Sequence, residues 1–114
     1  MSIEFEDVNE NLRRIALSGR LDIPGTDAIS LKFTALAAAT QRRVIIDLTA
    51  VSFLASIGIR ALITNAKALQ QRGGKTVLFV GNNEGVTKTL EATGIDVLLP
   101  MFADAAEAEK AALA

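Results

Sequence analysis

The sequence predicts a single α/β domain, residues 1–114, in which a mixed and mostly parallel sheet of about five strands packs against about four helices. Short apolar runs alternate along the chain with stretches in which apolar residues recur every three or four positions. Glycine, asparagine or proline stands at most of the boundaries between these segments. A chain of 114 residues, half of them hydrophobic, is also long enough to bury a core of its own.

The predicted elements follow the order ββαβαβαβα, which implies right-handed crossover connections after an opening antiparallel pair. The predicted strands span residues 2–8, 12–18, 44–48, 76–80 and 95–99. The predicted helices span residues 26–39, 56–72, 84–92 and 103–113.

The first half of this order rests on turn residues. The Asn-Glu-Asn sequence at 9–11 favours a hairpin between two loosely alternating strands. Gly19 is expected to end the second strand, and Pro24-Gly25 to break the chain within a loop over residues 20–25. Thr26 or Asp27 can then cap the first helix.

The central strand and helix give the strongest pattern. Residues 44–48 are apolar except for Asp47, which is typical of a strand covered on both faces. We expect Asp47 to bond to nearby backbone amides, and residues 49–55 to form a loop. The following helix carries its apolar stripe at Ile59, Leu62, Ile63, Ala66 and Leu69. Gly73-Gly74 ends it.

In the last third of the chain, caps and breakers set the boundaries. Asn83 can cap a short helix that Gly94 ends. Pro100 limits the strand predicted at 95–99, and Asp104 lies in the first turn of an alanine-rich helix, where the helix dipole favours an acid.

Composition excludes several classes of function. The chain has no cysteine and no histidine, which removes thiol catalysis, disulfides, zinc-finger sites and imidazole base chemistry. Acids and bases are mixed at a net charge of −1, so nucleic acid is not the expected partner. No apolar run approaches the length of a membrane span and no signal peptide is visible, so a cytoplasmic protein is expected. The only rings available to the core are those of Phe5, Phe33, Phe53, Phe79 and Phe102.

The stretch FLASIGIRAL, residues 53–62, raises a question about Ser56. A helix cap explains the serine, because its hydroxyl would accept a bond from a first-turn amide and contribute about 1 kcal/mol. Gly58 does not suit a helix interior, where glycine costs about 1 kcal/mol relative to alanine. A glycine there is understandable when something approaches the backbone closely.

Three segments resemble the STAS domains, the family of bacterial anti-sigma factor antagonists. DLTAVSFLASIGIRALI (47–63) is similar to the family's Asp-Leu strand end and the Asp-Ser-Ser/Thr-Gly-Leu helix start. SGRLDIPGTDAI (18–29) resembles its Gly-Glu-Leu-Asp loop, and RGGKTVLFVGNNEGVTKTLEATGID (72–96) its Gly-Gly strand and following helix. The matches occur in the family's order and span nearly the whole chain, so a STAS-like fold is expected.

The resemblance implies a regulator that binds proteins and has no catalytic residues, metal or cofactor of its own. Ser56 corresponds to the serine that an anti-sigma factor serine kinase, an ATP-binding enzyme, phosphorylates and that a serine phosphatase restores. The unphosphorylated protein would hold the kinase, and phosphorylation would release it. The residues expected to contact partners are Asp22, Ile23, Pro24, Leu54, Ala55, Ser56, Ile57, Gly58 and Arg60.

Two departures from the family pattern keep alternatives open. Ala55 stands where many members have aspartate, and Ile57 where they have serine or threonine. The chain can therefore also be a constitutive interaction subunit, for example of a lipid-transport ATPase or a scaffold, with Ser56 only a helix cap. A third alternative is a small-molecule or nucleotide site near Asp22, Ser56 and Arg60, although no sequence feature indicates a particular ligand.

Overall fold

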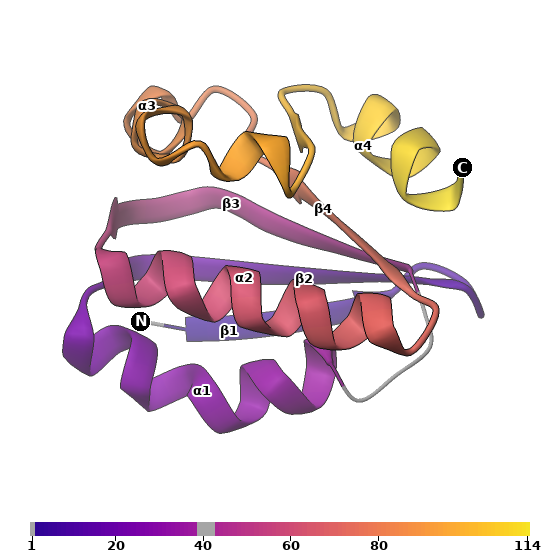
Figure 1. The fold of residues 1–114 in the computed structure, drawn as a ribbon, viewed down its shortest axis with the longest axis horizontal. Helices are drawn as coiled ribbons and strands as arrows, with labels where there is room; N and C mark the ends of the chain where they lie inside the picture. Colours follow the sequence, from indigo (N-terminus) through magenta and orange to yellow (C-terminus); the bar gives the residue numbers. More distant parts are fainter. Residues whose placement is uncertain (1, 39–42) are drawn as a thin grey trace.

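The computed structural model describes residues 2–38 and 43–114, and in these it shows a five-stranded mixed sheet with four α-helices (Figure 1). The strands are β1 (Ser2–Asp7), β2 (Leu12–Leu21), β3 (Arg43–Leu54), β4 (Lys75–Phe79) and β5 (Met101–Phe102). The helices are α1 (Ile23–Ala37), α2 (Ser56–Gln71), α3 (Glu84–Thr93), the 3₁₀ helix η1 (Ile95–Val97) and α4 (Ala105–Leu113). The predicted fold class and element order are confirmed.

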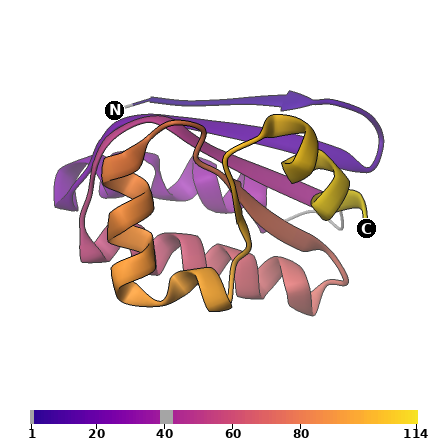
Figure 2. The ribbon, with the colours of Figure 1, turned by 90° about the horizontal axis from the view of Figure 1, so that it is seen from above.

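The strands lie in sequence order across the sheet. The β1–β2 pair is antiparallel and the other three pairs are parallel. Helices α1, α2 and α3 pack on one face, where their apolar residues join the main core cluster. Helix α4 covers part of the other face, on which Ala108 and Ala112 pack against Leu12, Ile45 and Val77 (Figure 2).

Strands β2 and β3 are both longer than the sequence predicts, so the loops expected at residues 20–25 and 49–55 are wrong. Gly19 does not end β2, because its positive φ of 85° lets the strand pass through an irregularity and continue to Leu21. The extended part of β2 gives β3 a partner as far as Leu54, which pairs with Leu21.

Helix α1 begins at Ile23, earlier than the predicted cap at Thr26 or Asp27. Asp22 is the N-cap, and its carboxylate accepts a hydrogen bond of 2.9 Å from the Gly25 amide. Pro24 lies in the first turn, where its missing N–H is harmless, so it starts the helix instead of breaking the chain. The helix ends at Ala37, and the predicted end at residue 39 lies outside the described residues.

The boundaries in the second half are mostly confirmed. Gly73 and Gly74 end α2 by donating to the carbonyls of Gln70 and Leu69, the bond pair of a Schellman motif. Asn83 caps α3, which Gly94 ends at a φ of 74°.

The strand predicted at 95–99 is wrong. This segment begins as η1, and the short strand β5 follows Pro100. Proline has no N–H to donate, but its carbonyl can still accept a hydrogen bond from a neighbouring strand. The Leu78 amide donates to the Pro100 carbonyl at 2.8 Å, so pairing with β4 begins at Pro100 and does not end there. Asp104 is the N-cap of α4 and not part of its first turn.

The aromatic core is smaller than expected. Phe33 is fully buried between α1 and the sheet, whereas Phe5 and Phe53 are exposed. A guanidinium covers each exposed ring: Arg13 lies 5.0 Å from the centre of Phe5 and Arg20 lies 4.4 Å from the centre of Phe53. The core is therefore built almost entirely from aliphatic side chains.

Candidate functional site

The predicted site residues meet where β2 and β3 end side by side and α1 and α2 begin. Leu21 and Leu54 are partners at the ends of the two strands, and the Ala55 amide donates to the Leu21 carbonyl at 2.9 Å. This bond fixes the first residue after β3 against the last residue of β2. The carboxyl ends of parallel strands are where α/β folds commonly place functional groups.

Ser56 is the first residue of α2 and is exposed to solvent. The N-cap is Ala55, with φ −86° and ψ 169°, and no side chain caps the helix. The interpretation of Ser56 as a helix cap is therefore wrong. Among the interactions of residues 2–38 and 43–114, none engages the Ser56 hydroxyl.

The start of α2 has unused capacity for negative charge. The first bond within the helix runs from the Ile59 amide to the Ala55 carbonyl at 3.1 Å, so the amides of residues 56–58 have no carbonyl partner in the helix. No acidic residue lies in its first turn. The positive end of the helix dipole is thus neutralised by neither a cap nor a nearby acid.

Gly58 is required by the packing of the chain on itself. A Cβ atom there would lie 2.9 Å from the Leu21 Cβ, 2.9 Å from the Leu54 Cδ1 and 3.0 Å from the Leu21 carbonyl oxygen. The sequence suggests that another group lies close to the backbone at Gly58. The structure shows that this group is not a partner but the ends of β2 and β3, at Leu21 and Leu54. Gly58 and Leu54 are buried and support the site from beneath.

The side chains around Ser56 that reach solvent are mainly apolar. Ile23 is 68% exposed and Phe53 is 42% exposed. Pro24 is exposed, while Ala55 and Ile57 are partly buried. We call the surface formed at this end of the sheet the Ser56 surface; its residues are Ile23, Pro24, Phe53, Ala55, Ser56 and Ile57.

Phe53 was missed as a site residue because the sequence analysis counted its ring in the core and placed the residue in a loop, whereas it lies in β3 and is 42% exposed. Phe53 pairs with Arg20 near the end of the lengthened β2, and the Arg20 guanidinium lies over its ring. The sequence does place Phe53 three residues before Ser56.

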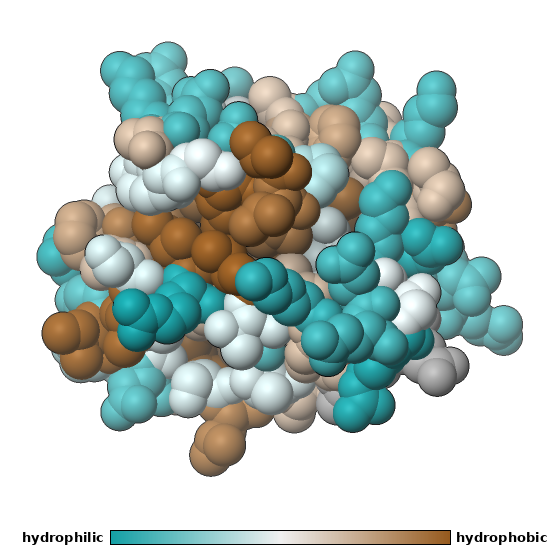
Figure 3. Space-filling view, viewed as in Figure 1, coloured by the Kyte–Doolittle hydropathy of each residue, from teal (hydrophilic) through white to brown (hydrophobic). Residues whose placement is uncertain are grey.

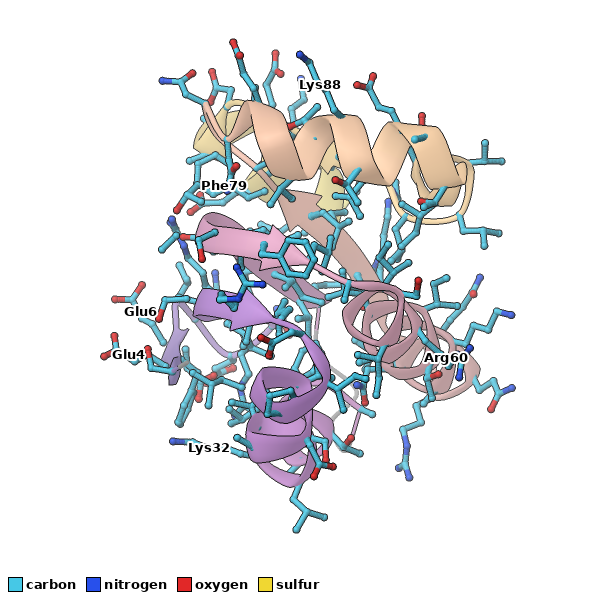
Figure 4. The ribbon with its side chains drawn as sticks, turned by 90° about the vertical axis from the view of Figure 1, so that its left-hand side faces the viewer. Glu4, Glu6, Lys32, Arg60, Phe79 and Lys88 are labelled. Atoms are coloured by element: carbon cyan, nitrogen blue, oxygen red, sulfur yellow. The ribbon has the colours of Figure 1, made fainter. Side chains whose placement is uncertain are left out.

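Few charges surround this surface. Arg20 pairs with Asp22 at 3.2 Å while it stacks on Phe53. The bond from the Gly25 amide, helped by Arg20, holds the pKa of Asp22 below its usual value. Arg60 lies on the exposed side of α2, on the opposite side of the molecule from Glu4 and Glu6 (Figure 4).

A groove of about 250 Å³ runs between the middle of α1 and the first half of α2. Arg60 and Ile57 line it, but Asp22 and Ser56 do not, so the three polar residues proposed for a small-molecule site do not share one pocket. Thr26 is buried at its base, and its hydroxyl has no hydrogen-bond partner. The groove is continuous with the Ser56 surface through Ile57.

Asp47 is structural, as the sequence predicts. Its carboxylate accepts bonds from the Thr49 amide at 2.9 Å and the Thr49 hydroxyl at 2.6 Å, and Arg14 reaches it at 2.7 Å. Burial raises the pKa of Asp47, but the bonds from Thr49 and Arg14 outweigh burial and leave the pKa below its usual value. Arg14 also stacks on Phe79. Through Arg14, Asp47 and Phe79, strands β2, β3 and β4 are therefore in side-chain contact on the face of the sheet away from Ser56.

Two absences concern the described part of the chain. Within residues 2–38 and 43–114 no three acidic, histidine or cysteine side chains are grouped so as to hold a metal ion. In the same residues no helix is both long and apolar enough to cross a bilayer.

Comparison with known proteins gives one family. The STAS domain model matches residues 6–108. No curated protein sequence is significantly similar to the chain.

Among solved structures, an anti-sigma factor antagonist from Mycobacterium paratuberculosis superposes with a TM-score of 0.85 at 22% identity, covering 99% of this chain and 94% of that one. The Bacillus anti-sigma factor antagonist SpoIIAA matches in its unphosphorylated form with a TM-score of 0.73 at 21% identity, covering 94% and 92% of the two chains. The murine anion transporter Slc26a9 matches with a TM-score of 0.75 at 17% identity, over 90% of this chain and 18% of the transporter. At these identities the structural likeness establishes the fold.

Proposed function

Because the STAS domain model covers most of its length, the chain belongs to the STAS domain family, and we propose that it is an anti-sigma factor antagonist that acts by partner switching. In its unphosphorylated form it binds an anti-sigma factor serine kinase in the cytoplasm. The kinase transfers the γ-phosphoryl group of ATP to the Ser56 Oγ, and the phosphorylated form dissociates. A serine phosphatase hydrolyses the ester and resets the switch. The chain itself is a regulator and a substrate, not an enzyme.

One observation carries this proposal: Ser56 is exposed at the uncapped start of α2, within a surface that is otherwise mainly apolar. A kinase can reach its hydroxyl without any movement of the backbone. Docking of a partner would bury Ile23 and Phe53, which are both well exposed in the free protein. Burial of apolar area of this kind is the main favourable contribution to protein association.

The free protein can hold a phosphate at Ser56. A phosphoserine carries about −1.5 to −2 charges, which the unpaired first-turn amides and the helix dipole both stabilise. Arg60 lies one turn further along α2, at the i+4 spacing that brings two side chains together on a helix surface. The ion pairs among the described residues are Arg13–Asp7, Arg14–Asp47 and Arg20–Asp22, so Arg60 is available to the phosphate.

The same charge opposes docking. At an apolar interface the phosphate loses its water and meets no matching cation from the partner. A penalty of about 2.7 kcal/mol weakens binding about a hundredfold, which is enough to change the partner that is bound. The fold does not have to move, because local charge alone decides association.

The test is incubation of the protein with an anti-sigma factor serine kinase and ATP, followed by mapping of the phosphate by mass spectrometry. We expect one phosphate at Ser56. Ser52 is also exposed and lies four residues earlier, so Ser52→Ala is the matched control that keeps full phosphorylation while Ser56→Ala abolishes it. Phosphate on Ser52, or on neither serine, would count against the proposal.

A second candidate function rests on Ala55 and on the likeness to the STAS region of a transporter. Without the family aspartate, the charge next to Ser56 differs from that of many members, which suits a constitutive interaction subunit. Such a subunit would bind its partner equally well as wild type and as Ser56→Asp. Partner switching instead requires that Ser56→Asp binds more weakly than Ser56→Ala.

A further inference from the structure

A second surface lies at the opposite end of the sheet from Ser56. A groove of about 380 Å³ separates the second half of α2 from the segment that joins η1 to β5, next to the first residues of β3 and β4. Its volume lies within the range of about 300–1,000 Å³ that is usual for ligand pockets. The side chains that line it belong to Arg43, Ile63, Ala66, Lys67, Gln70, Lys75, Thr76, Leu98, Leu99 and Pro100.

The walls of this groove are apolar. Ile63 and Ala66 from α2 face Leu98 and Pro100 across it. Leu98 is 61% exposed and its neighbour Val97 is 85% exposed, although both are large aliphatic residues. Figure 3 shows a continuous hydrophobic area on this face, bordered by hydrophilic side chains. An exposed apolar area with a polar rim is typical of an interaction site.

The charges around the groove all have one sign. Arg43, Lys67 and Lys75 line it, and none of the acidic residues in the described part of the chain does, although the net charge of the whole sequence is −1. Lys67 is exposed on α2, and Arg43 also donates to the backbone carbonyl of Ala114 at 3.4 Å. The groove thus combines apolar walls with a positive rim, and its complement is an apolar group flanked by carboxylates.

We propose that this groove binds an acidic peptide segment of a partner protein. Aliphatic or aromatic side chains of the segment insert between α2 and Leu98, and its Asp and Glu side chains pair with Lys67, Lys75 and Arg43. The α2 wall, from Ile63 to Gln70, is two turns or about 10 Å long at a rise of 1.5 Å per residue. This length suits two turns of a helical peptide or a few extended residues.

A small amphiphilic molecule fits these observations less well. Both Lys67 and Gln70 are exposed, so the groove is open to solvent along its α2 side. A small ligand usually has about 70–90% of its surface buried, which an open groove does not provide. A peptide needs only one face covered.

The peptide groove is independent of the Ser56 switch. Ile63 lies seven positions after Ser56 in α2, or about 10 Å further along the helix axis. Arg43 and Lys75 begin strands whose far ends lie towards the Ser56 surface. One molecule can therefore hold a partner at each end of the sheet.

The test is selection of a random twelve-residue peptide library displayed on phage against the immobilised full chain. We expect the enriched peptides to share at least two acidic residues next to aliphatic or aromatic ones. The synthetic peptides are then measured by fluorescence polarisation against variants whose folding is checked by circular dichroism. Leu98→Asp and Lys67→Glu should each raise the Kd about tenfold or more, which corresponds to 1.4 kcal/mol.

Two matched control variants carry the same substitutions outside the groove. Leu31→Asp makes the same change at an 89% exposed leucine on α1, and Lys88→Glu makes the same charge reversal on α3 (Figure 4). Both should leave the Kd unchanged, and so should Ser56→Asp. Binding should also weaken as salt is raised, because the charged contacts are exposed.

Other results would overturn the proposal. These are the absence of enriched peptides, enrichment of neutral or basic peptides, or binding that Leu98→Asp leaves intact. A parallel titration with laurate, followed by NMR, decides the remaining alternative: shifts around Leu98 with laurate but no acidic peptide would mean that the groove takes a small amphiphile. None of these outcomes bears on phosphorylation of Ser56, which is tested separately.

Discussion

Ala55→Asp should stabilise the protein, because it supplies the cap that α2 lacks. Ala55 has the extended backbone of an N-cap residue, with φ −86° and ψ 169°, but no side-chain oxygen. The amides of Ile57 and Gly58, at the second and third helical positions, have no helical partner. An aspartate at Ala55 can accept a hydrogen bond from either amide without a change in the chain path.

The magnitude follows from two contributions. Replacing alanine by aspartate at an N-cap typically contributes about 1 kcal/mol, within a range of about 0.5–2. An acid at the positive end of the helix dipole contributes about 0.3–1 kcal/mol, part of which is already included in the cap value. We therefore expect the free energy of unfolding to rise by about 1–1.5 kcal/mol, and Tm by about 4–6 °C for a domain of this size.

The assay is urea denaturation of wild type and three variants at pH 7 and low salt. Ala55→Asn keeps the capping oxygen without the charge and should retain most of the gain. Ala55→Glu keeps the charge but is too long to cap, so it should give only the smaller dipole contribution. If Ala55→Asp is no more stable than wild type, or if Ala55→Glu stabilises as much as Ala55→Asp, then α2 does not lack a cap at Ala55.

Three further predictions concern the residues that hold the site in place. Gly58→Ala should lower the free energy of unfolding by about 1–2 kcal/mol, because the new Cβ would lie 2.9 Å from the Leu21 Cβ; an unchanged denaturation midpoint would contradict this packing. Asn83→Ala should cost about 2–3 kcal/mol in the same assay, because Asn83 caps α3 and also donates to the Val51 carbonyl at 2.7 Å; a loss below about 0.5 kcal/mol would show that water replaces these bonds. The lowered pKa of Asp47 contributes stability that is complete above its unfolded pKa near 3.8 and is lost as the pH falls through the folded value. Denaturation of Asp47→Asn between about pH 6 and pH 2 should therefore show a weaker pH dependence than wild type, and identical slopes would argue against the ion pair.

The sequence alone predicted the structure correctly where the structure depends on a single local pattern of residues. The apolar stripe of α2, the glycine pair at 73–74 and the cap at Asn83 all lie as predicted, since each depends on residues within a turn or two of one another. The position of Ser56 at the start of α2 was predicted for the same reason. The phospho-acceptor role that the resemblance implies also requires Ser56 to be exposed, as it is. The absence of a side-chain cap on α2 was not predicted, because it depends on the N-cap position falling at Ala55.

The errors arose where a distant segment decided the structure. Gly19 looks like a strand end, but the pairing with β3 carries β2 through it. Phe53 looks like a core residue until the lengthened β2 places Arg20 beside it. From the sequence, Gly58 was expected to contact a partner. The structure shows instead that the Leu21 side chain packs against it. In each case a strand pairing that no local pattern reveals controlled the outcome.

The affinity of the protein for its cognate serine kinase, measured by titration calorimetry before and after phosphorylation of Ser56, tests the partner switch most directly. We expect the phosphorylated protein to bind about a hundredfold more weakly, while its circular dichroism spectrum stays unchanged. Equal affinity of the two forms, with phosphate confirmed on Ser56, would contradict the claim that this single charge controls docking.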